Sequence, residues 1–153
     1  MKENKIIIPL LLLLFVEVGS VLGQSRAARN DKNSLNKEIK FTEGGWKEIV
    51  ELATKNNKYI FVDAYAVWCG PCKMLKSNTF KEMEVGSFFN DNFINVTIDM
   101  EQGEGELLAK DWDVEAFPTL LFFNPQGDMV LKEIGFLDGK KLIRLGTEAL
   151  VKK

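Results

Sequence analysis

Histidine is absent from the 153 residues of the sequence. A Ser-His-Asp triad and a Cys-His protease pair both need histidine as the base, so both kinds of active site are excluded. Zinc sites with histidine ligands and acid–base catalysis by histidine are excluded for the same reason. Any catalytic chemistry of this protein must therefore come from other side chains.

Cysteine is almost as scarce, because the chain holds only two. Two thiols are too few for a four-cysteine zinc site or an iron–sulfur cluster within one chain. A glycine-rich dinucleotide fingerprint is also missing, and we expect no cofactor and no metal. Any reaction of the cysteines must use the two as a pair.

Neither sign of charge is in marked excess, since 20 basic and 22 acidic residues leave a formal net charge of -2. This balance provides no electrostatic attraction for nucleic acid or anionic lipid. Hydrophobic residues make up 46% of the chain, and 11 of them are phenylalanine. The length and composition predict one globular domain with a substantial core.

The N-terminal segment has the pattern of a secretory signal peptide. Lys2 and Lys5 form a short basic start, residues 6–16 are almost wholly apolar, and small residues lead up to Gly23. We therefore interpret residues 1–23 as a signal peptide that is cleaved after Gly23. An uncleaved membrane anchor is the lesser alternative, because the apolar run is shorter than the ~20 residues that a spanning helix needs.

Cleavage would leave a protein in the periplasm or outside the cell, with no stable membrane insertion. Residues 24–37 are polar and are expected to form a flexible leader. Residues 38–153 then make up the folded domain, for which we expect a monomer.

Hydrophobic periodicity predicts alternating strands and helices in this domain. Alternating or continuous apolar residues predict strands at 39–41, 59–66, 93–99, 119–124 and 129–134. Apolar spacings of three and four predict helices at 46–56, from 73 onward, at 85–90 and at 140–150. The acidic segment 101–111 has one apolar side and completes the alternation, and its glycine and glutamate positions do not match a calcium-binding EF-hand loop.

The alternation implies parallel pairing of the strands. A turn at 125–128 joins the last two strands in a hairpin, which adds an antiparallel edge to the sheet. We therefore expect an α/β fold with a mixed sheet of about five strands that is covered by helices.

The two cysteines lie in the run Trp68-Cys69-Gly70-Pro71-Cys72, where a predicted strand becomes a predicted helix. The free N–H groups and partial positive charge of a helix N-terminus stabilise a thiolate and lower the pKa of its thiol. The spacing of three brings the two sulfurs within reach of each other across one turn. Cys69 can then attack a substrate disulfide, and Cys72 can displace the substrate from the mixed disulfide.

Two other interpretations of the pair stay open. A structural disulfide would close a very short loop, and such a loop restricts the unfolded chain little. A zinc half-site would require two further ligands from a partner chain. The position of the pair between strand and helix favours redox chemistry.

The segments around the cysteines resemble those of a known family. Residues 62–73 are similar to the active-site segment of thioredoxins, residues 117–120 resemble their cis-proline loop, and Gly135 matches a family glycine near that loop. The resemblance extends over residues 39–150. It is greatest to secreted thioredoxin-like proteins related to the soluble domains of thiol:disulfide interchange proteins, and it implies a thioredoxin-like three-layer sandwich.

The resemblance implies a role for the cis-proline loop. Pro118, in a cis peptide bond, would hold its backbone beside Cys69, and Phe117 would pair with an extended substrate as an added strand. Gly70 and Pro71 would complete the substrate-binding surface. A simple break between a helix and a strand is the alternative role of Pro118.

The resemblance also implies roles for two residues beside the cysteines. Asp63 matches a buried acid that assists proton transfer at Cys72, and a solvated acid at the end of the strand is the alternative. Trp68 would pack beside the sulfurs as a flat docking surface, with a plain core aromatic as the alternative. The chain departs from the family at Val67, where an acid is common, and at Asn95, where a lysine commonly pairs with the buried acid.

Together these observations predict a thiol–disulfide oxidoreductase that acts on the thiols and disulfides of exported proteins. The Gly-Pro pair between the cysteines resembles that of thioredoxins and favours a reductase, which outside the cytosol would need a membrane electron-relay protein as donor. A redox-linked chaperone or adaptor that binds polypeptide in the cis-proline groove is the alternative. A peroxidase is weaker, since no Thr or Arg signature accompanies Cys69.

Overall fold

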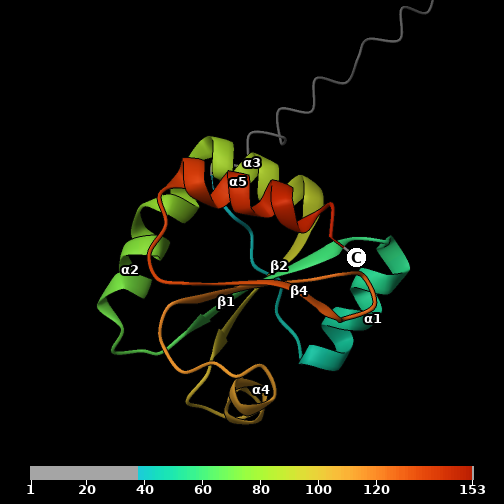
Figure 1. The fold of residues 1–153 in the computed structure, drawn as a ribbon, viewed down its shortest axis with the longest axis horizontal. Helices are drawn as coiled ribbons and strands as arrows, with labels where there is room; N and C mark the ends of the chain where they lie inside the picture. Colours follow the sequence, from blue (N-terminus) through green and yellow to red (C-terminus); the bar gives the residue numbers. More distant parts are fainter. Residues whose placement is uncertain (1–37, 153) are drawn as a thin grey trace, which may run out of the picture. The chain divides into compact units, whose positions relative to one another are not determined.

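The computed structural model describes residues 38–152, which form a four-stranded sheet with helices on both faces (Figure 1). The strands, in sheet order, are β2 (Phe93–Asp99), β1 (Tyr59–Tyr65), β3 (Thr119–Phe123) and β4 (Met129–Ile134). The helices are α1 (Trp46–Asn56), α2 (Gly70–Ser77), the 3-10 helix η1 (Thr79–Lys81), α3 (Met83–Asn92), α4 (Gly105–Asp111) and α5 (Gly139–Ala149).

The described residues confirm the predicted α/β class. None of their helices is long and apolar enough to cross a membrane. The predicted signal peptide at 1–23 and the predicted leader at 24–37 lie outside the described residues.

The sheet has one strand fewer than the roughly five predicted, because residues 39–41 form only an isolated bridge from Phe41 to Asn95. The backbone of this segment bonds mainly elsewhere. The side chain of Asn90 in α3 accepts a hydrogen bond from the Lys40 N–H at 2.9 Å, and the Ile39 N–H donates to the carbonyl of Phe80 at 2.7 Å. These bonds tie the segment to α3 and η1, while the Phe41 bridge and the bond from the Thr42 N–H to the carbonyl of Asn95 at 2.7 Å tie it to β2.

The direction of β3 differs from the predicted parallel alternation. β1 and β2 are parallel, whereas β3 is antiparallel to β1 and β4 is antiparallel to β3. The connecting helix α4 has seven residues and is about 10 Å long, shorter than the ~23 Å of a seven-residue strand, and the chain does not run back along the sheet before β3 begins. β3 therefore starts at the sheet edge where β2 ends, the same edge at which β1 leads into the cysteines.

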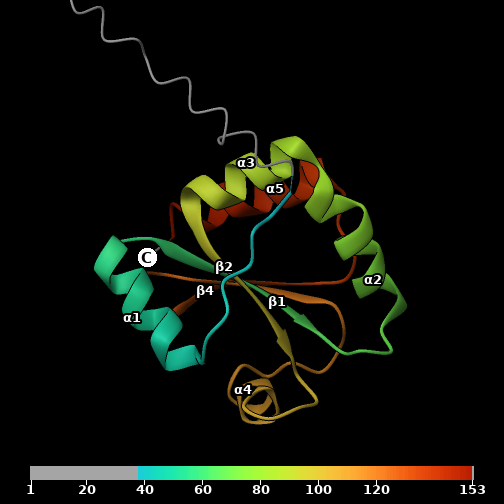
Figure 2. The same cartoon turned by 180° about the vertical axis from the view of Figure 1, so that it is seen from behind.

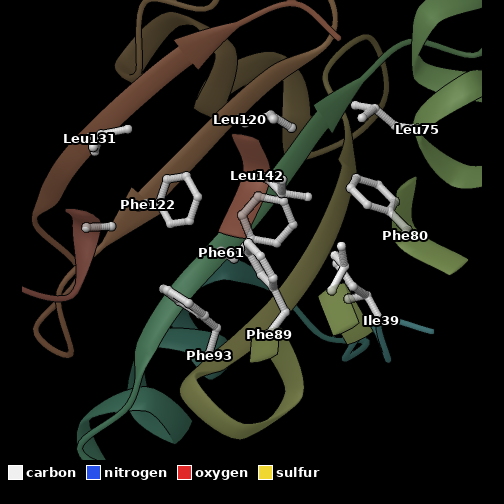
Figure 3. Packing of buried hydrophobic residues seen from close by; sticks show 12 residues of the cluster. Ile39, Phe61, Leu75, Phe80, Phe89, Phe93, Leu120, Phe122, Leu131 and Leu142 are labelled. Carbon is white, nitrogen blue, oxygen red and sulfur yellow. The ribbon is translucent and has the colours of Figure 1, made fainter. Parts of the chain in front are cut away.

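Helices α2, α3 and α5 cover one face of the sheet, and α1 and α4 lie against the other face (Figures 1 and 2). The first core centres on Phe61, whose ring centroid is 4.7 Å from that of Phe89 and 5.1 Å from that of Phe122 (Figure 3). In the second core, Trp46 packs against Trp112 and Phe123 with both centroid distances at 4.7 Å. The predicted layered architecture is confirmed.

Strand β1 is buried on both faces, as its continuous apolar run predicts. Ile60 and Val62 belong to the core beneath α1 and α4, and Phe61 belongs to the core beneath α2, α3 and α5. Side chains alternate along a strand, so Asp63 and Tyr65 share the face of Phe61. This alternation places the one acid of β1 beneath the helix that carries the second cysteine.

Candidate active site

The cysteine pair lies where β1 passes into α2. Cys69 is the N-cap of α2, and its Sγ accepts a hydrogen bond from the Cys72 N–H at 3.1 Å. The two residues are joined in a disulfide, and their Cα atoms are 5.3 Å apart. Pro71 falls in the first turn, where its missing N–H leaves no helix hydrogen bond unmade. The helix begins at Gly70, because Cys69 caps it.

The oxidised pair is buried, with Cys69 2% exposed and Cys72 1% exposed. Burial in the oxidised form therefore does not distinguish the attacking cysteine from the resolving one. Gly70 and Pro71, between them, are exposed, and Val67 is 55% exposed beside them. A substrate that approaches the pair thus meets backbone and apolar side chains.

The cis-proline loop faces the cysteines. The Phe117–Pro118 peptide bond is cis, as the resemblance implies, and Phe117 packs in the same small apolar cluster as Cys69. The Gly135 N–H donates to the carbonyl of Pro118 at 2.8 Å, and a φ of +104° at Gly135 explains the glycine there. The Thr119 hydroxyl donates to the carbonyl of Ala116 at 2.7 Å and closes the loop on itself.

Trp68 is 65% exposed and so is not a core aromatic. Its ring centroid lies 5.8 Å from that of Phe117 in an edge-on arrangement. The indole N–H donates to Oε2 of Glu101 at 2.8 Å. Glu101 follows the end of β2. Sequence reasoning missed it because an acidic segment of this kind is typical of a solvent-exposed loop. These two contacts hold the indole as an exposed flat surface next to the disulfide.

Asp63 is fully buried, so the alternative of a solvated acid at the strand end is wrong. The Thr97 hydroxyl donates to its Oδ2 at 3.2 Å, and its Oδ1 has no hydrogen-bond partner among the described residues. Desolvation raises the pKa of Asp63 from 3.8 to about 6, while the charge of Lys76 and the bond from Thr97 hold back part of that rise. A carboxyl with this pKa can both take and release a proton near neutral pH.

Asn95, which stands where the family commonly has a lysine paired with the buried acid, does not bond Asp63. Asp63 lies opposite Thr97, whereas Asn95 lies opposite Phe61. The Asn95 amide donates instead to the carbonyl of Lys40 at 3.3 Å. The hydrogen-bond partner of Asp63 is therefore a threonine.

The cation that lowers the pKa of Asp63 is Lys76, which comes from α2 rather than from β2. Sequence reasoning missed this residue. Its place four residues after Cys72, and thus on the same helix face, is the one sequence signal that points to it.

The hollow beside the second cysteine has a volume of about 190 Å³. Its lining residues are Tyr65, Ala66, Val67, Cys72, Lys73 and Lys76. A larger hollow of about 570 Å³ lies near α4, with Glu101 and Glu106 in its wall. Within residues 38–152, no group of three or more His, Cys, Asp and Glu side chains could hold a metal ion. The described site is therefore made of two sulfurs, a buried acid and an apolar surface.

Residues 42–125 match a family described as thioredoxin-like. Thioredoxin H4-1 of Oryza sativa subsp. japonica is 30% identical over 77% of this chain and 87% of its own length. The thiol:disulfide interchange protein DsbD of Photorhabdus laumondii is 36% identical over 63% of this chain, but the match spans only 17% of the length of that relative.

Solved structures share the fold. A Bacteroides thetaiotaomicron protein proposed to be a disulphide-isomerase superposes with a TM-score of 0.68 and 38% identity over 76% of this chain and 97% of that one. The oxidised C-terminal domain of Neisseria meningitidis DsbD superposes with a TM-score of 0.60 at 21% identity over 72% of this chain and 98% of that one. The chain therefore belongs to the thioredoxin-like family of thiol–disulfide oxidoreductases, and the Cys69–Cys72 disulfide fits a redox-active site.

Proposed function

We propose that this protein is an exported protein-disulfide reductase. The observation that carries the proposal is the Cys69–Cys72 disulfide at the N-terminus of α2, directly beside the cis Phe117–Pro118 bond. A helix N-terminus stabilises the thiolate of the reduced pair, and the cis-proline loop leaves backbone free for an extended substrate.

The reaction starts from the reduced pair. The Cys69 thiolate attacks one sulfur of a substrate disulfide, that disulfide breaks, and its electron pair leaves on the other substrate sulfur, which takes up a proton. Cys72 then gives its proton to Asp63 and attacks the Cys69 sulfur of the mixed disulfide. The Cys69–Cys72 disulfide forms, and the second substrate sulfur leaves as a thiolate that takes the proton from Asp63. Two electrons have passed from the protein to the substrate.

Substrate binding uses the exposed surface around the pair. An extended segment pairs with the backbone of Phe117, as a strand added to a sheet edge. Trp68 is 65% exposed and offers a flat apolar surface. Gly70 and Pro71 lie exposed between the cysteines, and an ideal Cβ at Gly70 would meet nothing within 4 Å. The space above this turn is therefore open to a polypeptide.

The direction of electron flow and the location rest on further features. The Gly-Pro pair favours a reductase, and the predicted signal peptide at 1–23 favours export to the periplasm or beyond the cell. A reductase in an oxidising compartment must be re-reduced by a dithiol donor. A membrane electron-relay protein would fill that role, and thiol:disulfide interchange proteins among the relatives support this choice. We propose that the domain works as a monomer.

The reduction potential of the Cys69/Cys72 couple tests the proposal. Purified protein is equilibrated in dithiothreitol buffers of graded potential, and the reduced fraction is counted by thiol alkylation and mass. We expect a two-electron transition near the value of thioredoxin, about -270 mV. A value near -120 mV would mean an oxidant instead. Absence of any reversible transition would remove the redox function altogether.

A redox-linked chaperone or adaptor is the second candidate. Val67, Trp68 and Met74 are 55%, 65% and 49% exposed around the pair, and an apolar surface of this kind binds polypeptide. A variant with both Cys69→Ser and Cys72→Ser separates the two candidates. Loss of insulin-disulfide reduction together with retained suppression of aggregation would favour the adaptor. Loss of both activities would favour the reductase.

A further inference from the structure

We propose that Lys76 is a positioning residue of the redox site, whose ammonium group keeps Asp63 ionised so that the carboxylate can take the proton of Cys72. This inference rests on the proposed function and adds to it a residue that the family motifs do not include. Lys76 acts through the carboxyl of Asp63 and not on a reacting sulfur.

The helix places Lys76 on the side of Cys72. The two residues are four apart in α2, so their side chains share one face of the helix. Lys76 is half-buried, and its Nζ lies 3.4 Å from the centroid of the Tyr65 ring. An ammonium group over an aromatic face is held there by electrostatic attraction. Tyr65 follows Asp63 by two residues in β1 and so lies on the same side of the sheet.

Two hollows meet at Lys76. The hollow of about 190 Å³ is lined by Cys72 and Tyr65. A second hollow, of about 320 Å³, is lined by Thr97, which donates the single hydrogen bond that Asp63 accepts through its side chain from the described residues. Among all residues that line either hollow, only Lys76 lines both. The Lys76 side chain therefore lies between the hollow lined by Cys72 and the hollow lined by Thr97, the residue that bonds Asp63.

A buried carboxylate needs a compensating charge, because burial without one strongly disfavours its ionised form. Asp63 has one oxygen without a hydrogen-bond partner among the described residues, so Thr97 alone does not compensate it. Lys76 lowers the pKa of Asp63 against the rise that desolvation causes.

Other titratable groups surround the acid. Burial and the charges of Asp99 and Asp63 raise the pKa of Tyr65, which keeps its ring neutral beneath Lys76. Lys73 in α2 and Lys81 in η1 are exposed. Glu38 is exposed and lines the same hollow as Thr97, and Asp99 follows Thr97 by two residues in β2. Solvent screens the exposed charges, so Lys76 is the half-buried cation that acts on the acid.

The test removes the charge of Lys76 and follows the proton of Asp63. The variants are Lys76→Met, Lys76→Arg, which keeps the charge, and Lys47→Met, which removes an exposed lysine from α1. Two readouts are compared: the pH profile of the resolving step in a single turnover with a protein disulfide, and the NMR titration of the Asp63 side-chain carboxyl in the oxidised protein. Thermal unfolding of each variant checks that it folds.

We expect Lys76→Met to move the acid limb of the profile and the Asp63 titration upward by about one pH unit. Resolution at pH 6 should then slow several-fold. Lys76→Arg should restore most of the shift, and Lys47→Met should leave both curves in place. In an Asp63→Asn background, Lys76→Met should have no further effect on the acid limb, because the acid through which it acts is gone.

An unmoved Asp63 titration in Lys76→Met would overturn the proposal, as would an equal effect of that substitution in the Asp63→Asn background. The NMR titration requires no turnover. A protein that fails to reduce disulfides would therefore refute the proposed function while the titration still decides the role of Lys76.

Discussion

At the residue scale, the most unusual feature of the domain is a carboxyl group in the middle of an apolar sheet. Asp63 is flanked in β1 by Val62 and Ala64, which are fully buried with it. Thr97 and Lys76 reduce the penalty of its charge but do not remove it. Natural proteins retain such a group where function requires it. The expected role in proton transfer therefore has a measurable thermodynamic consequence.

The stability of the protein should fall as pH rises through the titration of Asp63. The pKa is about 6 in the folded protein and 3.8 without burial. Between these pH values the folded state holds a proton that the unfolded state has lost, so the stabilising effect present below pH 3.8 is lost by the time the pH exceeds 6. The difference between the two pKa values corresponds to about 3 kcal/mol of the free energy of unfolding.

Asp63→Asn should therefore be more stable than the wild type by up to about 3 kcal/mol at pH 8, with a much smaller difference at pH 4. Urea unfolding of the oxidised proteins at the two pH values measures this. Asp91→Asn, at an exposed position of α3, is the matched control and should show no such dependence. An equal stability difference at both pH values would mean that Asp63 is not the titrating group.

At the scale of elements, the sequence predicted most helices and strands. The prediction failed where contacts between elements determine the bounds or direction of an element. β1 and α1 occupy their predicted residues within one position, because each has a strong periodicity. α4 occupies only the last seven residues of the acidic segment 101–111. The reason is Gly105, whose backbone packs directly on the end of β2, so the helix starts where this close approach ends.

Gly105→Ala should destabilise the protein by roughly 1–3 kcal/mol. A Cβ at this position would collide with the carbonyl oxygen of Asp99, and backbone must move to admit it. The movement should also weaken the bond from Trp68 to Glu101, which lies in the same connection, and so change the tryptophan fluorescence.

Urea unfolding and the emission spectrum measure the two effects of Gly105→Ala. Gly70→Ala is the control for stability, because an added Cβ there meets nothing within 4 Å. If both alanine variants unfold at the same urea concentration as the wild type, the contact between α4 and β2 does not contribute to stability.

At the scale of the whole molecule, the sheet lies between two helix layers (Figure 1), with one core on each of its faces. This arrangement puts the ends of β1 and β2 and the start of β3 at one edge, together with the cysteines. The site thus draws on residues 63–76, 97–101 and 117–119, which are separate stretches of the sequence.

We expect the chain to be cleaved after Gly23, so that the exported protein begins at Gln24. Expression of the full chain in a bacterium, followed by mass spectrometry of the periplasmic and secreted fractions, identifies the new N-terminus. Leu12→Arg, which places a charge in the apolar run, should keep the protein in the cytoplasm. Recovery of the uncleaved chain in the membrane fraction would instead support the membrane anchor.

The sequence by itself determined the redox pair and the segments around it. Cys69 and Cys72 lie between a continuous apolar strand and a helix, and both signals are local patterns of side-chain period and chain ends. The resemblance at 117–120 also identified the cis-proline loop in advance. Patterns of this kind can be recognised from the sequence alone, because each involves only about ten neighbouring residues.

Only the tertiary structure decided which side chains surround the pair. Thr97 instead of Asn95 bonds Asp63, because the register between β1 and β2 sets that neighbour. The charge of Lys76 lowers the pKa of Asp63 because α2 lies over the same sheet face, and Glu101 bonds Trp68 because β2 ends beside the cysteines. Register, strand direction and helix placement follow from the packing of distant segments. Their effect on the chemistry of two cysteines could not be predicted from local sequence patterns.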